Sequence, residues 1–215
     1  MARFVVESWS ADYGAPLDTD PEPGQEAPPA DTGVEIPTAE WQPITPFGPR
    51  AGRVVFIDGV QRLDARIWLP DEAGFSHMGV CASYAAGAVL CEEAAGLASF
   101  TVQRGAFGPS NLEVIDCGSG IVYRPVPVVD TSPAGLDAAL MRQRDALEVS
   151  VATQAPPADI VVVDGHLRQR ESIENAVGYI KTHHAAYLEP EQGAVVGRLT
   201  PGQRTPVFLL ETPWS

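Results

Sequence analysis

The sequence predicts an α/β domain built on a mixed sheet. Two apolar runs rich in β-branched residues, at 54–57 and 160–163, each end in Asp-Gly. Such runs suit strands covered on both faces, as in the middle of an α/β sheet. Between them, residues 132–153 have the start signal and the apolar stripe of a helix. We therefore expect three antiparallel strands, then a helix, then a strand parallel to the first, with flanking helices.

The first 52 residues predict an acidic, proline-rich segment and a lead-in that precede a domain at 53–215. Residues 11–40 are rich in Pro, Asp, Glu and Gly and nearly lack aromatic or β-branched side chains. This composition cannot bury enough apolar surface to offset ordering, so we expect a flexible acidic loop. The lead-in that follows is expected to be extended and to pack Trp41 and Phe47 on the domain.

The strands of the domain are predicted from alternation and from turn signals. Residues 53–58 form the first strand, and Gly59 is expected to turn the chain into an antiparallel neighbour at 60–69. The small apolar residues 77–90 predict a third strand packed closely under a helix. Shorter strands are expected outside these three, at 100–104, 112–116 and 121–129, and residues 4–9 are expected to form either a short edge strand or a docking segment.

A helix is predicted to start at Ser132-Pro133, since a capping residue followed by proline favours a helix N-terminus. Leucines and valines form its apolar stripe, and Glu148 lies beside that stripe. The strand that ends at Asp164 follows this helix. Beyond it, residues 171–187 predict a second helix, which carries Lys181 and His183. Two last strands are expected at 195–199 and 206–211.

Composition and charge limit the functions open to the chain. The net charge of −14 argues against binding nucleic acid through a broad basic surface. Residues 1–40 contribute −8 of it, which leaves −6 for the remaining 175 residues. No apolar run is long enough to cross a bilayer and no signal peptide is evident, so we expect a cytoplasmic protein without membrane contact. Three cysteines without CxxC spacing indicate neither a disulfide framework nor a zinc site.

The two acidic strand ends are the strongest indication of chemistry. If the strands lie side by side, Asp58 and Asp164 come together, and paired carboxylates suit Mg²⁺ or Mn²⁺. Asp-Gly after a strand is also a common turn signal, and either copy alone fits that interpretation equally well. Two copies at the two most sheet-like segments favour a metal site and phosphoryl-transfer chemistry. The chain contains neither a P-loop nor a GxSxG motif, which argues against an ordinary NTPase and a serine hydrolase.

The predicted order of elements resembles that of RNase H-like nucleases. More narrowly, VVFIDGVQRLDARIWL, RQRDALE and VVVDGHL followed by Lys181 resemble the NurA family over residues 53–211. This resemblance implies that Asp58, Glu148 and Asp164 bind Mn²⁺ or Mg²⁺ and that Lys181 contacts the scissile phosphate. His183 is a further candidate for proton transfer or substrate contact, and the alternative for this histidine is a place on the solvated face of the predicted helix.

The resemblance to NurA also implies a function and partners. NurA proteins are metal-dependent DNA nucleases that work with the HerA hexameric translocase in DNA end resection, a part of DNA repair. The family places a further catalytic aspartate or histidine in a C-terminal segment, and nothing in this chain matches it. We therefore expect a homodimer, or a second chain that supplies the missing part. The alternative is a non-catalytic RNase H-like scaffold that binds a partner.

Overall fold

The structure is a computed structural model, and it describes residues 5–7, 29–70, 74–167, 173–180 and 187–210. The chain forms two compact units, each made of two segments. Unit 1 comprises Met1–Asp20 and Ala51–Tyr179, and unit 2 comprises Pro21–Arg50 and Ile180–Ser215. Lys181 and His183 lie outside the described residues. No helix in the described part of the chain is long and apolar enough to span a membrane.

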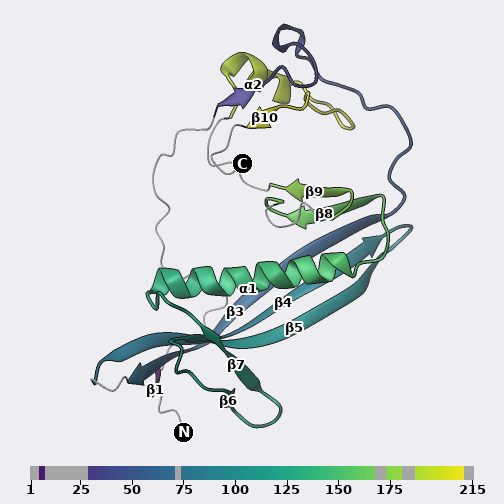
Figure 1. Cartoon of the computed structure of the whole chain (residues 1–215). Helices are drawn as coiled ribbons and strands as arrows, with labels where there is room; N and C mark the ends of the chain where they lie inside the picture. The colour runs from purple at the N-terminus through teal and green to yellow at the C-terminus, as the bar shows by residue number, and fades with distance from the viewer. Residues whose placement is uncertain (1–4, 8–28, 71–73, 168–172, 181–186, 211–215) are drawn as a thin grey trace. The chain divides into compact units, whose positions relative to one another are not determined.

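Unit 1 is an α/β structure with an eight-stranded mixed sheet, in the order β6-β7-β5-β4-β3-β8-β9, with β1 also paired to β3 (Figure 1). Its strands are β1 (Val5–Glu7), β3 (Val54–Pro70), β4 (Ser76–Cys91), β5 (Ala95–Gly108), β6 (Ile115–Asp116), β7 (Val122–Pro127), β8 (Ile160–Asp164) and β9 (Ala176–Tyr179). The predicted α/β class and its mixed sheet are therefore confirmed.

Three long antiparallel strands, β3, β4 and β5, form the centre of the sheet. The sequence predicts a turn at Gly59, and this prediction is wrong: β3 runs without a break from Val54 to Pro70. The segment at 60–69 is thus the second half of β3, and the segment at 77–90 falls in β4. The third antiparallel strand is β5, which is longer than the predicted strand at 100–104. Gly59 is an ordinary strand residue paired with Ala86 of β4, and a buried side chain of the helix lies against it.

The helix α1 (Pro133–Thr153) lies across one face of β3, β4 and β5 (Figure 1). Its predicted start is confirmed, since Ser132 is the N-cap and its hydroxyl accepts a hydrogen bond from the Gly135 N–H at 3.2 Å. The predicted stripe is buried against the sheet. Alanines of β4, including Ala82 and Ala86, face this helix and let it approach closely. This packing forms the main core and covers one face of the three central strands.

Part of the other face is covered by the segment that contains β6 and β7. A β-bulge at Asp64 shifts the alternation of β3, so that Ile67 and Leu69 point to this face and join a second apolar cluster. Asp64 itself accepts hydrogen bonds from Ser83 Oγ at 2.5 Å and from Tyr123 OH at 3.1 Å. Burial, together with Asp64, raises the pKa of Tyr123 to about 12. The Asp64 carboxylate thus ties β7 to the centre of the sheet.

The parallel part of the sheet consists of β8 beside β3 and β9 beside β8. The strand β8 and its parallel alignment with β3 agree with the sequence-based prediction. The second predicted helix, at 171–187, is wrong where the structure describes it, because Ala176–Tyr179 forms β9. Without β9, one edge of β8 would carry unpaired backbone N–H and C=O groups. Hydrogen bonds to these groups stabilise the short strand β9.

Unit 2 contains β2 (Ala30–Asp31), a 3₁₀ helix η1 (Thr38–Glu40), α2 (Pro190–Val196) and β10 (Leu209–Leu210). Residues 30–40, predicted as part of a flexible loop, are therefore structured, and the strand predicted at 195–199 is instead the end of α2 and a turn. Trp41 is buried as predicted, and its indole N–H donates to the Thr32 carbonyl at 2.7 Å. Phe47 is fully exposed, contrary to the prediction.

Lowering the pH should weaken a contact that joins the two segments of unit 2. Arg204 donates two hydrogen bonds of 2.7 Å to the carboxylate of Glu35, and the Val207 N–H donates a third at 2.7 Å. With the Arg204 bonds as the largest cause, these contacts lower the pKa of Glu35 from 4.5 to about 2. The folded pKa lies below the unfolded one, so the stabilisation is complete above about pH 5 and disappears as the pH falls towards 2.

The measurement is the urea midpoint of the wild-type chain and of Glu35→Gln between pH 7 and pH 2. We expect the wild type to be the more stable at pH 7 and the two midpoints to converge towards pH 2. A constant difference between the two midpoints over this range would contradict the prediction.

Candidate functional site

Asp58 and Asp164 lie at the same level on neighbouring parallel strands. The register of β3 and β8 pairs Phe56 with Val162 and Ile57 with Val163, and the two aspartates are the next residue of each strand. Neighbouring strands lie about 4.8 Å apart, so the two backbones are within reach of a shared ligand. The structure therefore brings these two predicted site residues together.

The two aspartates also point to the same face of the sheet. Ile57 and Val163 are buried in the core beneath α1. Because side chains alternate along a strand, Asp58 and Asp164 point to the face away from α1. Asp58 is exposed there and accepts a hydrogen bond from the Gly59 N–H at 2.9 Å, whereas Asp164 is half-buried. At least one carboxylate is thus open to solvent and to a ligand.

Glu148 lies on the opposite face from these aspartates. It is in the last turns of α1, with only 4% of its surface exposed, and its carboxylate rests on Gly59. A β-carbon at residue 59 would overlap the carboxylate of Glu148. Gly59 follows Asp58 directly, so their side-chain positions are on opposite faces of β3. The backbone of β3 therefore lies between Glu148 and the Asp58 carboxylate.

Arg144 compensates the buried charge of Glu148. Its Nε lies 3.4 Å from Glu148 Oε1, one helical turn away, and its guanidinium also contacts Gln61 and Asp145 at 3.4 and 2.9 Å. Gln61 is two residues beyond Gly59 and belongs to the same face of β3. A buried carboxylate needs such partners because desolvation is costly. Glu148 and Arg144 thus form a polar group between α1 and β3.

The possible ligands for a metal ion are accordingly two carboxylates. Among the residues that the structure describes, no three His, Cys, Asp or Glu side chains gather as a metal-ligand group. Mg²⁺ usually binds through one or two carboxylates and completes its shell with water and substrate phosphates. Asp58 and Asp164, on one face and with one side chain exposed, fit this requirement. Glu148 does not belong to the pair.

Two residues near the aspartates were not singled out from the sequence. Tyr179 of β9 is the register partner of Asp164, and 58% of its surface is exposed. His166 is exposed just beyond the turn at Gly165, whose φ is 78°. Tyr179 was missed because its segment was predicted to be helical. The sequence AVGY after Asn175 carries a weak strand signal that could have identified it.

No family model matches the chain, and no curated protein matches it. Among solved structures, the chain is similar to the crystal structure of the NurA nuclease from Sulfolobus solfataricus, with a TM-score of 0.32 and 16% sequence identity. This similarity covers 74% of the present chain and 37% of the nuclease chain. The chain therefore spans little more than a third of the length of that nuclease.

Proposed function

We propose that this chain is a divalent-cation-dependent deoxyribonuclease of RNase H-like, NurA type. The observation that carries the proposal is the pairing of Asp58 with Asp164 at one level of neighbouring parallel strands, on a face that α1 leaves open. Oxygen ligands in this arrangement suit Mn²⁺ or Mg²⁺ and leave coordination positions for substrate phosphates. The sequence resemblance to NurA points to the same chemistry.

The described residues have distinct roles in this proposal. Asp58 and Asp164 hold the cation, which when bound activates a water molecule and stabilises the leaving oxygen of the phosphodiester. Glu148 acts as a positioning residue, because it supports the backbone of β3 at Gly59, next to Asp58. Its ion pair with Arg144 keeps the carboxylate in that position.

Other parts of the proposal rest on the sequence alone. Lys181 is proposed to contact the scissile phosphate, and His183 to assist proton transfer or to contact substrate. The resemblance further suggests a HerA-like hexameric ATPase as partner, in DNA end processing in the cytoplasm. It also suggests a homodimer, or a second chain that supplies the C-terminal segment of NurA proteins.

The test is cleavage of end-labelled single-stranded and duplex DNA by the purified chain with Mn²⁺, with Mg²⁺ and with EDTA. A HerA-like ATPase, the proposed partner, is added in a second series to test whether turnover depends on it. We expect cleavage with a divalent cation and none with EDTA. Absence of cleavage with either metal, alone and with the ATPase, would reject the nuclease proposal.

The alternative is a non-catalytic scaffold with the same sheet. The observation in its favour is that Glu148, which the family resemblance assigns to the metal, is buried on the other face and paired with Arg144. Isothermal titration with Mn²⁺ distinguishes the two functions. Binding that saturates in the millimolar range or below supports the nuclease, and absence of binding heat together with absence of cleavage supports the scaffold.

A further inference from the structure

The strand β3 has one edge that the other described strands cover only at its two ends. β4 pairs with the opposite edge along Val54–Pro70, apart from the bulge at Asp64. On the side in question, β8 pairs with residues 54–57 and β1 with residues 66–68. No described strand pairs with residues 58–65 on that side, which we call the β3 edge.

Backbone groups of Gly59, Gln61 and Leu63 point to the β3 edge. The carbonyl of Arg53 faces this side of β3, since it accepts a hydrogen bond from the N–H of Ile160 at 3.4 Å. Along a strand the N–H and C=O groups alternate between the two edges, so every second residue after Arg53 faces the same way up to the bulge. The Gly59 N–H donates to the carboxylate of the preceding aspartate at 2.9 Å. The two backbone groups of Gln61 and of Leu63 have no partner in any described strand.

Side chains of α1 lie beside the β3 edge on one face of the sheet. Glu148 rests on Gly59. Arg144, one helical turn earlier, has its Nη1 atom 3.4 Å from Gln61 Oε1, so this part of α1 runs antiparallel to β3. Met141 is nearly one further turn back, and therefore lies further along the edge, with 41% of its surface exposed. The edge thus has an accessible apolar side chain next to it on the α1 side.

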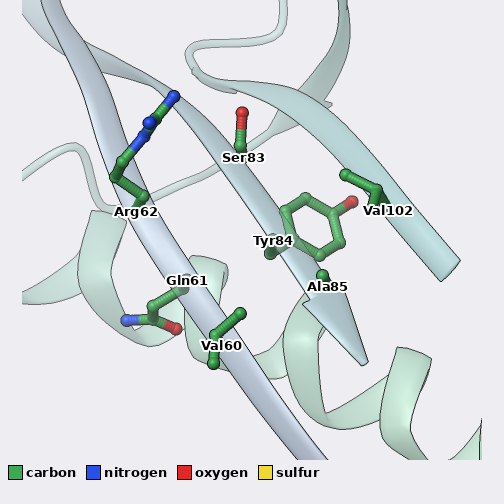
Figure 2. A pocket seen from close by; sticks show the side chains of 7 residues that line it. All are labelled: Val60, Gln61, Arg62, Ser83, Tyr84, Ala85 and Val102. Atoms are coloured by element: carbon green, nitrogen blue, oxygen red, sulfur yellow. The ribbon is translucent and has the colours of Figure 1, made fainter. Parts of the chain in front are cut away.

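The open face of the sheet also offers apolar surface beside the β3 edge. Val60 is 64% exposed there and borders a cavity of about 420 Å³. Figure 2 shows the side chains that line this cavity on three adjacent strands: Val60, Gln61 and Arg62 of β3, Ser83, Tyr84 and Ala85 of β4, and Val102 of β5. Side chains of a strand alternate between the two faces of a sheet. A strand added at the β3 edge would therefore find apolar contacts on both faces.

The length of the β3 edge argues against the same edge of a second copy. β3 is 17 residues long, whereas the edge spans only residues 58–65. In an antiparallel pairing the two ends of the second β3 would overlap β8 and β1 of the first, which lie in the plane of the sheet. A second copy would also bring a further net charge of −14. The edge therefore suits a short extended segment of about six residues, whose chain leaves the sheet at both ends.

We propose that the β3 edge binds an extended segment of a partner protein as an additional β-strand. Hydrogen bonds to the backbone groups of Gln61 and Leu63 provide the affinity, as in other cases of strand addition to a sheet edge. β-Branched or aromatic residues in the segment suit the apolar surface on both faces. Lysine or arginine at its ends suits a chain of net charge −14 that places Asp58 at one end of the edge. The inference needs neither a cation nor DNA, so it is independent of the proposed nuclease function.

A synthetic peptide tests the inference on the full chain. The probe is a fluorescent seven-residue peptide that alternates valine with threonine and has a lysine at each end. Its control is the same peptide with N-methylated backbone amides, which cannot donate hydrogen bonds to the β3 edge. In anisotropy titrations we expect only the unmethylated peptide to bind.

Gln61→Pro should weaken binding of the unmethylated peptide. Proline removes one N–H from the β3 edge but leaves the hydrogen bonds to β4 in place, because the Gln61 N–H points away from β4. We expect a loss of about 5- to 100-fold in affinity, since a carbonyl of the peptide loses its donor. Gln61→Ala is the matched control, because it keeps the N–H and should bind like wild type.

Amide hydrogen exchange of the wild-type chain, followed by NMR, tests the inference without any variant. In the free chain the amides of Gln61 and Leu63 should exchange faster than that of Val60, whose N–H faces β4. The unmethylated peptide, at about ten times its dissociation constant, should slow the exchange of both amides about tenfold.

The outcomes that overturn the inference are distinct. Binding that survives N-methylation of the peptide, or that is unchanged in a folded Gln61→Pro variant, means that the peptide does not pair with the β3 edge. Absence of binding at millimolar peptide also rejects the site. Slow exchange of Gln61 and Leu63 in the free chain means that the edge is already occupied, by another part of this chain or, where the rate depends on protein concentration, by a second copy.

Discussion

Replacing Asp58 with asparagine should strongly reduce metal-dependent cleavage and leave the fold intact. Asparagine keeps the shape of the side chain but removes one of the two negative charges that lie side by side where β3 and β8 are paired. Because the bound cation contributes several kcal/mol to the stabilisation of transition-state charge, we expect the rate to fall by about two to three orders of magnitude. The measurement is the initial rate of DNA cleavage at saturating Mn²⁺, with the HerA-like ATPase present if the wild type requires it.

Thermal unfolding provides a second measurement on the same variant, independent of turnover. Mn²⁺ at a hundred times its dissociation constant should stabilise wild type by about 2.7 kcal/mol, or about 5 to 10 °C in Tm. Asp58→Asn should lose this rise. Without metal it should be slightly more stable than wild type, by up to about 1 kcal/mol, because like charges on neighbouring strands no longer repel.

The matched control is Glu93→Gln, which removes one negative charge from an exposed position in the turn between β4 and β5. It should keep both cleavage and the Mn²⁺-dependent rise in Tm. The metal assignment fails if Asp58→Asn retains the rise, or if Glu93→Gln loses it to the same extent.

The elements with strong local signals could be predicted from the sequence. A capping serine, a proline in the first turn and a regular apolar stripe define α1, and four consecutive β-branched residues define β8. In both cases the signal lies within the element itself. The order of three antiparallel strands, a helix and a parallel strand follows from such signals. In the antiparallel part the strand at 77–90 agrees with β4, whereas β3 was wrongly divided at Gly59 and β5 was predicted too short.

Predictions failed where packing outweighs a local signal. Asp58-Gly59 is a common turn signal, but Gly59 has no positive φ and β3 continues through it. The glycine at this position leaves space for Glu148, which is distant in the sequence. Likewise β9 depends on the free edge of β8 for its hydrogen bonds, and no pattern within residues 176–179 reveals that edge.

The candidate site could be predicted only in part, because it too depends on packing between elements that are distant in the sequence. Two apolar runs of equal length, each followed by aspartate, place Asp58 beside Asp164 once the strands are parallel neighbours. Which face the aspartates share depends on which residues of β3 meet α1, and the sequence leaves both choices open until the helix is placed. Glu148 was therefore assigned to the aspartates on the evidence of the resemblance, although it packs on the far side of β3.

Gly59→Ala should show directly whether Glu148 occupies that position. Alanine is normally more favourable than glycine in a strand, by about 0.5 to 1 kcal/mol. Here its β-carbon would overlap the buried carboxylate of Glu148, which would have to leave its position beside Arg144. We expect a loss of about 1 to 3 kcal/mol in the free energy of unfolding, measured by urea denaturation. Gly96→Ala, where a β-carbon meets no atom within 4 Å, should cost nothing.

A double-mutant cycle makes the cause explicit. In a Glu148→Ala background the obstacle is absent, so Gly59→Ala should no longer destabilise the chain relative to Glu148→Ala alone. Equal costs in the two backgrounds would mean that the carboxylate does not rest on Gly59. The role of Glu148 as the residue that supports β3 beside Asp58 would then fail. The stability of a glycine variant therefore tests the positioning role of Glu148.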